Sequence, residues 1–158
     1  MRLERSEDEK RVTAVLFHPD IFPHVSDDGE ERVFVRHPKL YYLMVQVDEP
    51  ISMDGVKAAD IGMVTFTPVN FCTWIPHVSI LPGHRSLGLG SLALAVGMGW
   101  MWEHIPNCWK LVARPPAFNH AMIRVFEKCG FHREGRSPKS FMRHGVLHDR
   151  IYFGYERD

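Results

Sequence analysis

One stretch decides the fold of this chain: Ile80-Leu81-Pro82-Gly83-His84-Arg85-Ser86-Leu87-Gly88-Leu89-Gly90-Ser91. It follows a run rich in β-branched and aromatic residues and precedes the apolar run from Leu92 to Trp102. A strand that leads through glycines into a helix directs unpaired backbone N–H groups and the positive end of the helix dipole at one point. Gly88 and Gly90 have no side chain to block an anion, and Arg85 can pair with phosphate oxygens. The stretch therefore predicts a pyrophosphate site.

Other glycine-rich motifs fit the stretch less well. A P-loop ends in Gly-Lys-Ser/Thr, whereas this stretch continues as Gly90-Ser91-Leu92. A dinucleotide fingerprint that starts at Gly88 tolerates Ala93 as its third small residue but leaves Arg85 without a role. A tight strand-to-helix turn that binds nothing is a further alternative. The pattern that uses every distinctive residue is Arg-x-x-Gly-x-Gly after an Ile-x-Pro strand end.

Size and composition bound the class of protein. The 158 residues predict one domain, residues 1–158, and the balance of 19 basic and 19 acidic side chains gives no argument for a nucleic-acid or membrane partner. Three cysteines without Cys-x-x-Cys spacing, and a charged N-terminus without a secretory apolar core, predict a reducing cytoplasm. The apolar run 92–102 is about half as long as a membrane span, so we expect a buried helix.

The N-terminal third predicts two short helices. Ser6-Glu7-Asp8-Glu9 has the form of a capping box, in which Ser6 and Glu9 exchange side-chain to backbone hydrogen bonds, so a helix is expected to start there. His18-Pro19 ends this helix, because proline disfavours the helical conformation of the residue before it. Apolar residues within 21–25 predict the second helix.

The middle of the chain predicts an antiparallel meander that leads into a βαβ unit. Strands are expected over 33–35, 40–47, 61–66 and 71–80, with Pro50 and Asp54-Gly55 marking a hairpin turn between the second and third. A helix over 91–104 then leads to a strand over 108–113, parallel to the fourth strand through a right-handed crossover. The C-terminal part predicts a helix from Asn119 that stops at Gly130, a strand from Phe131 that is interrupted at Ser137-Pro138, and a final strand over 149–155.

A second motif makes the prediction more specific. It reads Asn119-x-Ala121-Met122-Ile123-x-x-Phe126-Glu127-Lys128-Cys129-Gly130-Phe131, and a helix and a strand separate it from the Arg-x-x-Gly-x-Gly loop. Together the two motifs resemble the GNAT superfamily of N-acetyltransferases, over roughly residues 60–155. The resemblance implies an α/β fold whose mixed sheet is splayed between the fourth and fifth strands, with acetyl-CoA as co-substrate.

The resemblance also implies how acetyl-CoA is held. Main-chain groups of the fourth strand would pair with the pantetheine amides, the loop amides would hold the pyrophosphate, and Asn119 would face the pantetheine or a water near the thioester, although it is also a good N-cap. The expected cofactor-binding residues are Val78, Ser79, Ile80, Arg85, Ser86, Leu87, Gly88, Leu89, Gly90, Ser91, Asn119 and Phe126.

The catalytic groups are less regular than the loop. Many family members place a tyrosine directly before the Glu-Lys pair, where this chain has Phe126, and strand 109–113 lacks the carboxylate of some protein N-terminal acetyltransferases. We therefore expect His77 and Asn119 to be the catalytic candidates, with His77 acting as a base directly or through a water. Strand alternation places His77 on the face opposite Val78 unless a bulge intervenes.

Three hypotheses of function stay open at this point. The first is an acetyl-CoA-dependent N-acetyltransferase acting on an amine of a protein or a small molecule. The second is an acyl-CoA-binding GNAT module that does not catalyse and acts through protein partners. The third is a phage-encoded modifier or accessory protein, because residues 18–28 resemble the N-terminal stretch of small acetyltransferase-like proteins of bacteriophages. In this architecture 18–28 would wall the acceptor site, although an ordinary surface loop is equally compatible.

Metal binding and assembly are only weakly indicated. The pairs His18 with His24 and His144 with His148 lack a convincing ligand set, so no metal is expected. The run Ile151-Tyr152-Phe153 would pair with a second copy in a homodimer or form a packed edge within one chain.

Overall fold

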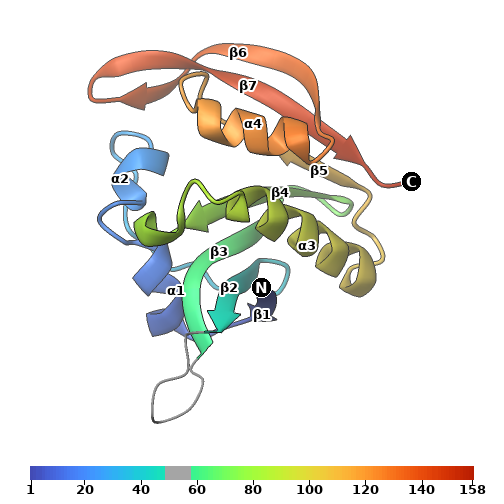
Figure 1. Ribbon diagram of the computed structural model, residues 1–158. Helices are drawn as coiled ribbons and strands as arrows, with labels where there is room; N and C mark the ends of the chain where they lie inside the picture. Colours follow the sequence, from blue (N-terminus) through green and yellow to red (C-terminus); the bar gives the residue numbers. More distant parts are fainter. Residues whose placement is uncertain (49–57) are drawn as a thin grey trace.

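The computed structural model describes residues 1–48 and 58–158 (Figure 1). The strands form one seven-stranded sheet in the order β1-β2-β3-β4-β5-β7-β6. The strands are β1 (Arg2–Arg5), β2 (Tyr41–Asp48), β3 (Ala58–Pro68), β4 (Thr73–Ile80), β5 (Lys110–Ala113), β6 (His132–Arg143) and β7 (Val146–Glu156). The helices are α1 (Glu9–Leu16), α2 (Phe22–Val25), α3 (Leu89–His104) and α4 (His120–Lys128), with a short 3-10 turn, η1 (Pro82–His84).

The sheet is mixed, as the sequence predicted. β4 and β5 are parallel, and every other neighbouring pair of strands is antiparallel. The meander over β2, β3 and β4, the crossover through α3 and the C-terminal hairpin of β6 and β7 are therefore confirmed. Figure 1 shows α3 and α4 side by side on one face of the sheet, with β6 and β7 above α4.

Alternating residues of β3 divide the core between the two faces of the sheet. Val64 and Phe66 pack with the α3 residues Ala93 and Leu94, whereas Met63 packs with Val12 and Val15 of α1. Gly97 allows α3 to lie close to the sheet, since a Cβ there would be 3.2 Å from the Phe66 ring. The apolar character of α3 on several sides is thus explained by burial against β3 and contact with α4.

The start of α1 differs from the predicted capping box. Asp8 is the N-cap, and its Oδ1 accepts from the backbone N–H groups of Lys10 (3.0 Å) and Arg11 (3.3 Å). Ser6 instead donates its backbone N–H to Tyr42 O at 3.0 Å, which extends the pairing of β1 with β2. Because Ser6 belongs to the strand side of the turn, the helix begins two residues later than a Ser6 cap would allow.

In the N-terminal part, one predicted strand is absent from the described structure and one observed strand was not predicted. Residues 33–35 are not a strand; Phe34 stacks on Tyr42, and the Tyr42 hydroxyl donates to Val35 O at 2.8 Å. Contacts with the Tyr42 side chain therefore hold this segment in place of the backbone hydrogen bonds that a strand would make. Strand β1 was missed because its four residues are mostly exposed and show no apolar alternation. The turn at Pro50 and Asp54-Gly55 lies outside the described residues.

The C-terminal hairpin carries the interruption that Ser137-Pro138 predicted. Its register shifts between Ser137 and Phe141, and Lys139 within this bulge has a φ of 50°. The turn between the strands contains His144 and Gly145, with φ of 52° and 72°. Successive left-handed residues suit a tight hairpin turn, which glycine adopts without steric cost.

Candidate active site

The two halves of the sheet separate between β4 and β5. Among the described residues these strands pair only at Thr73 with Lys110 and at Trp74 with Leu111, so β4 continues without a partner on that side. A cleft of about 790 Å³ lies there, within the range typical of small-ligand sites. Its walls come from β4, the following loop, the first turn of α3, α4, residues near α2 and the end of β6. The predicted splay between the fourth and fifth strands is confirmed.

The loop between β4 and α3 presents backbone N–H groups to this cleft. Gly88 is the N-cap of α3 with a φ of 73°, and Ser86 is also left-handed with a φ of 64°. Among the described residues, no side chain caps this end of α3. The cleft is lined here by Gly88, Leu89, Gly90 and Ser91. The first amides of a 16-residue helix and its positive dipole end thus face the cleft, which favours an anion.

Arg85 lines the cleft, but its guanidinium has partners that the sequence did not indicate. Nε donates to Ile80 O and Nη2 donates to Asp20 O, both at 2.9 Å. The guanidinium that was expected to pair with phosphate oxygens therefore connects the loop to Asp20. A backbone carbonyl leaves no signature in a sequence, so this connection was not predictable.

Gly90 sets the width of the cleft between β4 and α4. A Cβ at this position would lie 3.7 Å from a methyl of Val125 and 4.0 Å from a methyl of Val78. An alanine side chain would just fit, whereas a branched side chain would fill the space between the two valines. A small residue at position 90 is therefore needed to keep the slot open.

Residues Val78, Ser79 and Ile80 of β4 all line the cleft, as expected. Their position depends on Gly62 of β3, where a Cβ would overlap Ser79 O. Gly62 lies beside a bulge in the pairing of β2 with β3. The close approach of two backbones explains the glycine, and a lone glycine within an apolar strand is the signal that sequence reasoning did not use.

Asn119 has the N-cap role that the sequence offered and lies at the cleft. Its Oδ1 accepts from the backbone N–H of Met122 at 3.2 Å, which makes it the N-cap of α4. It also lines the cleft, together with Met122 and Val125 of the same helix. The cap fixes the side chain at the edge of the cleft.

Two expected cofactor-binding residues lie elsewhere. Leu87 is exposed and is not among the residues that line the cleft. Phe126 is buried and packs with Phe131 and Phe153, with ring centroids 5.2 and 6.0 Å away. The ring at the position of the family tyrosine is thus part of the core between α4 and the C-terminal strands.

His77 lies on the face of the sheet that carries α1. His77 of β4 is opposite Thr65 of β3, and Val78 is opposite Val64. The pairing of β3 with β4 has no bulge from Gly62–Ile80 to Pro68–Trp74. The residue keeps exposed surface, yet the surrounding protein atoms and the charge of Arg150 lower the pKa of His77 to about 4. The imidazole is therefore neutral near pH 7 and can accept a hydrogen bond, and His77 is not among the residues that line the cleft.

The structure adds basic residues that the sequence analysis did not assign to the site. Arg124 and Lys128 of α4 line the cleft, as do His84 and Arg143. Arg124 and Lys128 are four residues apart, which places them on one face of α4. This four-residue spacing, on the helix that begins after Asn119, was the sequence signal that could have placed both residues at the site. Their charges would attract the phosphates of a nucleotide cofactor.

A group of potential metal ligands lies away from the cleft. His132, Glu134 and Glu156 are exposed and close together on β6 and β7. The Lys110 ammonium pairs with Glu134 at 2.7 Å and with Glu156 at 3.3 Å. This arrangement is accounted for as a surface ion-pair cluster.

Comparison with known proteins agrees with the geometry. The model of the Acetyltransferase (GNAT) family matches residues 16–131, and the chain belongs to this family. No curated protein sequence matches the chain. Among the described residues, no helix is long and apolar enough to cross a membrane.

Solved structures share the fold over nearly the whole chain. Ribosomal-protein-alanine N-acetyltransferase from Brucella melitensis is 15% identical, with a TM-score of 0.74, covering 99% of this chain and 100% of that one. Spermidine N-acetyltransferase from Vibrio cholerae, in complex with CoA and spermine, is 16% identical, with a TM-score of 0.75 and coverage of 98% and 94%. The protein yncA from Salmonella typhimurium, with its cofactor acetyl-CoA, is 16% identical, with a TM-score of 0.72 and coverage of 100% and 94%.

Proposed function

We propose that this protein transfers the acetyl group of acetyl-CoA to a primary amine. The observation that carries the proposal is the meeting of three features in one cleft. Among the described residues, these are the edge of β4 that has no partner strand, the N-terminus of α3 that has no side-chain cap, and the side chain of Asn119. A phosphate-bearing cofactor with a peptide-like arm has matching groups for the first two of these features.

The donor would lie with its pyrophosphate on the amides of residues 88–91 and its pantetheine arm in the slot between Val78 and Val125. The pantetheine amides would pair with the open edge of β4 in the manner of an added strand. Arg124 and Lys128 would contribute positive charge beside the phosphates. Asn119, fixed as a cap, would face the pantetheine or a water near the thioester.

The chemical step requires a neutral amine. Its nitrogen attacks the acetyl carbonyl carbon, a C–N bond forms, the C–S bond breaks, and the proton lost by the nitrogen balances the thiolate as a thiol. Deprotonation near pH 7 costs about 4 kcal/mol for a lysine amine but only about 1 kcal/mol for an α-amine. An α-amine therefore needs less help from a base. His77 is the candidate base, and because it lies on the α1 face of β4 and does not line the cleft, it would act through a water.

A second function is favoured by one specific observation. Phe126 lies in the core where many family members carry a tyrosine that protonates the leaving thiolate, and a phenyl ring has no proton to give. A module that binds acyl-CoA without catalysis would keep the loop and the slot and lose the acid. Turnover of acetyl-CoA with an amine distinguishes this module from an enzyme.

Calorimetric titration of acetyl-CoA into the full chain is the first test. Binding is expected for the wild type and is expected to be lost in Gly88→Glu, which places a carboxylate at the amides and strains a residue with a φ of 73°. Gly83→Glu is the matched control, because Gly83 is in the same loop with nothing within 4 Å of a Cβ and no positive φ. Equal affinity of all three proteins would contradict the assignment of the loop.

A coupled assay of thiol release follows the binding test. Release of CoA in the presence of a primary amine supports the enzyme. Tight binding with no release for any amine supports the non-catalytic module. Arg85→Ala is less informative than Gly88→Glu, because it also removes the hydrogen bond to Asp20 O.

A further inference from the structure

The end of the sheet away from the cleft carries large apolar side chains that are exposed. Phe71 is 72% exposed, Trp109 53% and Val69 44%. Val69 and Phe71 belong to the turn between β3 and β4, and Trp109 directly precedes β5. Figure 1 shows this turn and the start of β5 on the side of the molecule where the chain ends, away from α2. Single exposed apolar residues are ordinary, whereas a group of large ones marks an interaction surface.

Backbone hydrogen bonds fix the positions of these side chains relative to one another. Trp109 N donates to Cys72 O at 2.9 Å, and the side-chain amide of Asn107 donates to Phe71 O. Arg157 N in turn donates to Trp109 O at 2.9 Å. The β3–β4 turn, the start of β5 and the residues after β7 are thus joined where the two aromatic residues lie. Aromatic side chains on a fixed backbone lose little conformational entropy when they bind a partner.

Two cations lie over the exposed rings. Lys39 Nζ is 5.6 Å from the centroid of the Phe71 ring, and the central guanidinium carbon of Arg157 is 5.4 Å from the Trp109 ring. Within residues 1–48 and 58–158, no carboxylate forms an ion pair with either cation, and this includes Asp158, which follows Arg157 in the chain. The aromatic patch is therefore both apolar and positively charged, and it consists of Val69, Phe71, Trp109, Lys39 and Arg157.

The charge of the aromatic patch distinguishes between its possible occupants. In a symmetric contact with a second copy the patch would meet itself, and its two cations would face the same two cations, which repel. Bases of a single-stranded nucleic acid could stack on the rings, but two cations neutralise only about two phosphates, where tight binding uses about six to ten. Anionic membranes are bound by clusters of about four to eight basic residues. Carboxylates beside an apolar side chain match both features of the patch.

We propose that the aromatic patch docks an acidic segment of another protein. An apolar side chain of the segment packs on the rings of Phe71 and Trp109, and its carboxylates pair with Lys39 and Arg157. Tryptophan and arginine are the residues that most often dominate the affinity of such interfaces. Val78, the first residue of β4 that lines the cleft, comes seven residues after Phe71, which is about 23 Å of extended chain. The docking surface therefore goes beyond the proposed acetyl transfer and does not depend on it.

The test is a selection from a library of random dodecapeptides on the immobilised full-length protein at physiological salt. The enriched peptides are expected to combine Asp or Glu with an aromatic or branched aliphatic residue. A synthetic copy of the most enriched peptide is expected to bind the wild type in solution with a micromolar Kd. A selection that enriches nothing, or enriches peptides without acidic residues, overturns the inference.

Alanine variants locate the selected peptide on the protein. Phe71→Ala and Trp109→Ala are each expected to weaken its binding at least about tenfold, the loss typical of an aromatic anchor at an interface. Both rings are exposed, so the variants should keep the fold, which melting curves check. Leu147→Ala is the matched control, because Leu147 is 49% exposed at the start of β7 and lies outside the patch. Equal affinity of the wild type and the three variants overturns the assignment of the patch.

Charge reversal tests the second half of the proposal. The double variant Lys39→Glu, Arg157→Glu should lose the acidic peptide and should enrich basic peptides in a fresh selection. Continued enrichment of acidic peptides by this variant overturns the role of the two cations.

Three further measurements examine the other occupants. Single-stranded oligo-dT and vesicles of phosphatidylserine and phosphatidylcholine are expected to bind the wild type no more tightly than they bind Trp109→Ala. Sedimentation is expected to give the same molecular mass for both proteins. Tighter binding of DNA or vesicles to the wild type, or self-association that Trp109→Ala abolishes, would give the patch that occupant and overturn the inference.

Discussion

Single residues decide whether the cleft is open. Gly90 leaves a slot between Val78 and Val125, and Gly62 lets the backbone of β3 approach Ser79 of β4. Neither glycine has a positive φ, since the left-handed residues of the loop are Ser86 and Gly88. Both glycines leave space. At Gly90 the space is the slot proposed for the ligand, and at Gly62 the backbone of β4 fills it.

Replacing Gly90 by valine should block the donor without unfolding the protein. The branched side chain would enter the slot between the two valines, so acetyl-CoA affinity is expected to fall at least about tenfold, the loss typical of a steric conflict in a packed site. Gly99→Val is the control, because Gly99 lies on the same helix with nothing within 4 Å of a Cβ. Calorimetry on both variants, with melting curves, makes the comparison. Equal affinities would argue against a ligand in the slot.

His77 offers a test that depends on pH. Since its folded pKa lies below that of an unfolded histidine, the unfolded chain binds more protons between about pH 4 and 6.5. The contribution of His77 to stability is therefore lost as pH falls through this window. His77→Gln should show a weaker loss of stability between pH 7 and 5 in urea unfolding, and its kcat should fall by about 10²–10⁴ if the imidazole is the base. An unchanged kcat would remove His77 from the mechanism.

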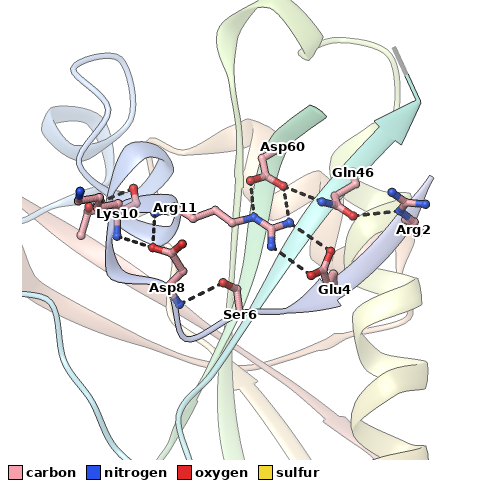
Figure 2. Close-up of polar contacts among 9 residues, drawn as sticks. Arg2, Glu4, Ser6, Asp8, Lys10, Arg11, Gln46 and Asp60 are labelled. Atoms are coloured by element: carbon pink, nitrogen blue, oxygen red, sulfur yellow. Dashed lines mark hydrogen bonds and ion pairs between the residues drawn. The ribbon is translucent and has the colours of Figure 1, made fainter. Parts of the chain in front are cut away.

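At the scale of elements, a polar network fixes α1 to the sheet (Figure 2). The Arg11 guanidinium meets both oxygens of Asp60 on β3, with Nη2 at 2.8 Å, and it also pairs with Glu4 of β1. Gln46 of β2 donates to Asp60 at 3.0 Å and accepts from Arg2 at 3.0 Å. One helix and three strands are thus joined through a single guanidinium and its neighbours, which fixes the orientation of α1.

Replacing Asp60 by asparagine should loosen α1 at neutral pH. Hydrogen bonds to charged groups contribute about 1.5–3 kcal/mol, so a loss of that order in the free energy of unfolding at pH 7 is expected. Arg11 lowers the pKa of Asp60, and this stabilisation is complete above the unfolded pKa and is lost as pH falls through the folded one. The difference between variant and wild type should therefore shrink near pH 3.

The control for this prediction is Glu7→Gln, which removes an exposed ion pair with Arg5. Exposed pairs contribute at most about 1 kcal/mol, so little change in urea unfolding is expected. If Asp60→Asn were as mild as Glu7→Gln at pH 7, the network would be an incidental feature of the surface.

At the scale of the whole molecule, much of the architecture could be predicted from local patterns. The glycine-rich loop, the Asn119 cap and the β-rich run before residue 80 identify the βαβ unit and the splayed sheet, because each depends on neighbours within a few residues. The start of α1 could not be predicted, since the backbone N–H of Ser6 donates to Tyr42 O of β2. Helix propensity and capping patterns do not predict a hydrogen bond between residues so far apart in the sequence.

The lining of the cleft was predictable where a local motif contains its residues, as in the glycine-rich loop and at Asn119. Residues 78–80 of β4 and the expected loop residues other than Leu87 line the cleft. Phe126 lies in the core instead, because the face that an α4 residue presents depends on how the helix packs. The partners of Arg85, Asp27 and Asp28 are backbone groups from distant segments. Nothing in a local pattern identifies which backbone carbonyl or amide will lie opposite a side chain.

The divided sheet leads to a prediction for the whole molecule. β4 and β5 pair at two positions, and residues 18–28 connect the two halves through hydrogen bonds of Asp20 and Asp28. A ligand bound along the open edge of β4 would add contacts to both halves that the unfolded chain lacks. At 100 times its Kd such a ligand stabilises the folded state by about 2.7 kcal/mol. For a domain of this size that corresponds to a rise in Tm of about 5–10 °C.

The melting experiment distinguishes binding along the whole cleft from binding of phosphates alone. Acetyl-CoA is expected to raise the Tm, and an equal concentration of ATP, which has phosphates but no pantetheine arm, is expected to raise it much less. Gly90→Val should reduce the response to acetyl-CoA toward that of ATP, because the blocked slot still leaves the amides of α3 accessible. An equal response to both ligands in the wild type would mean that the edge of β4 does not bind the pantetheine arm.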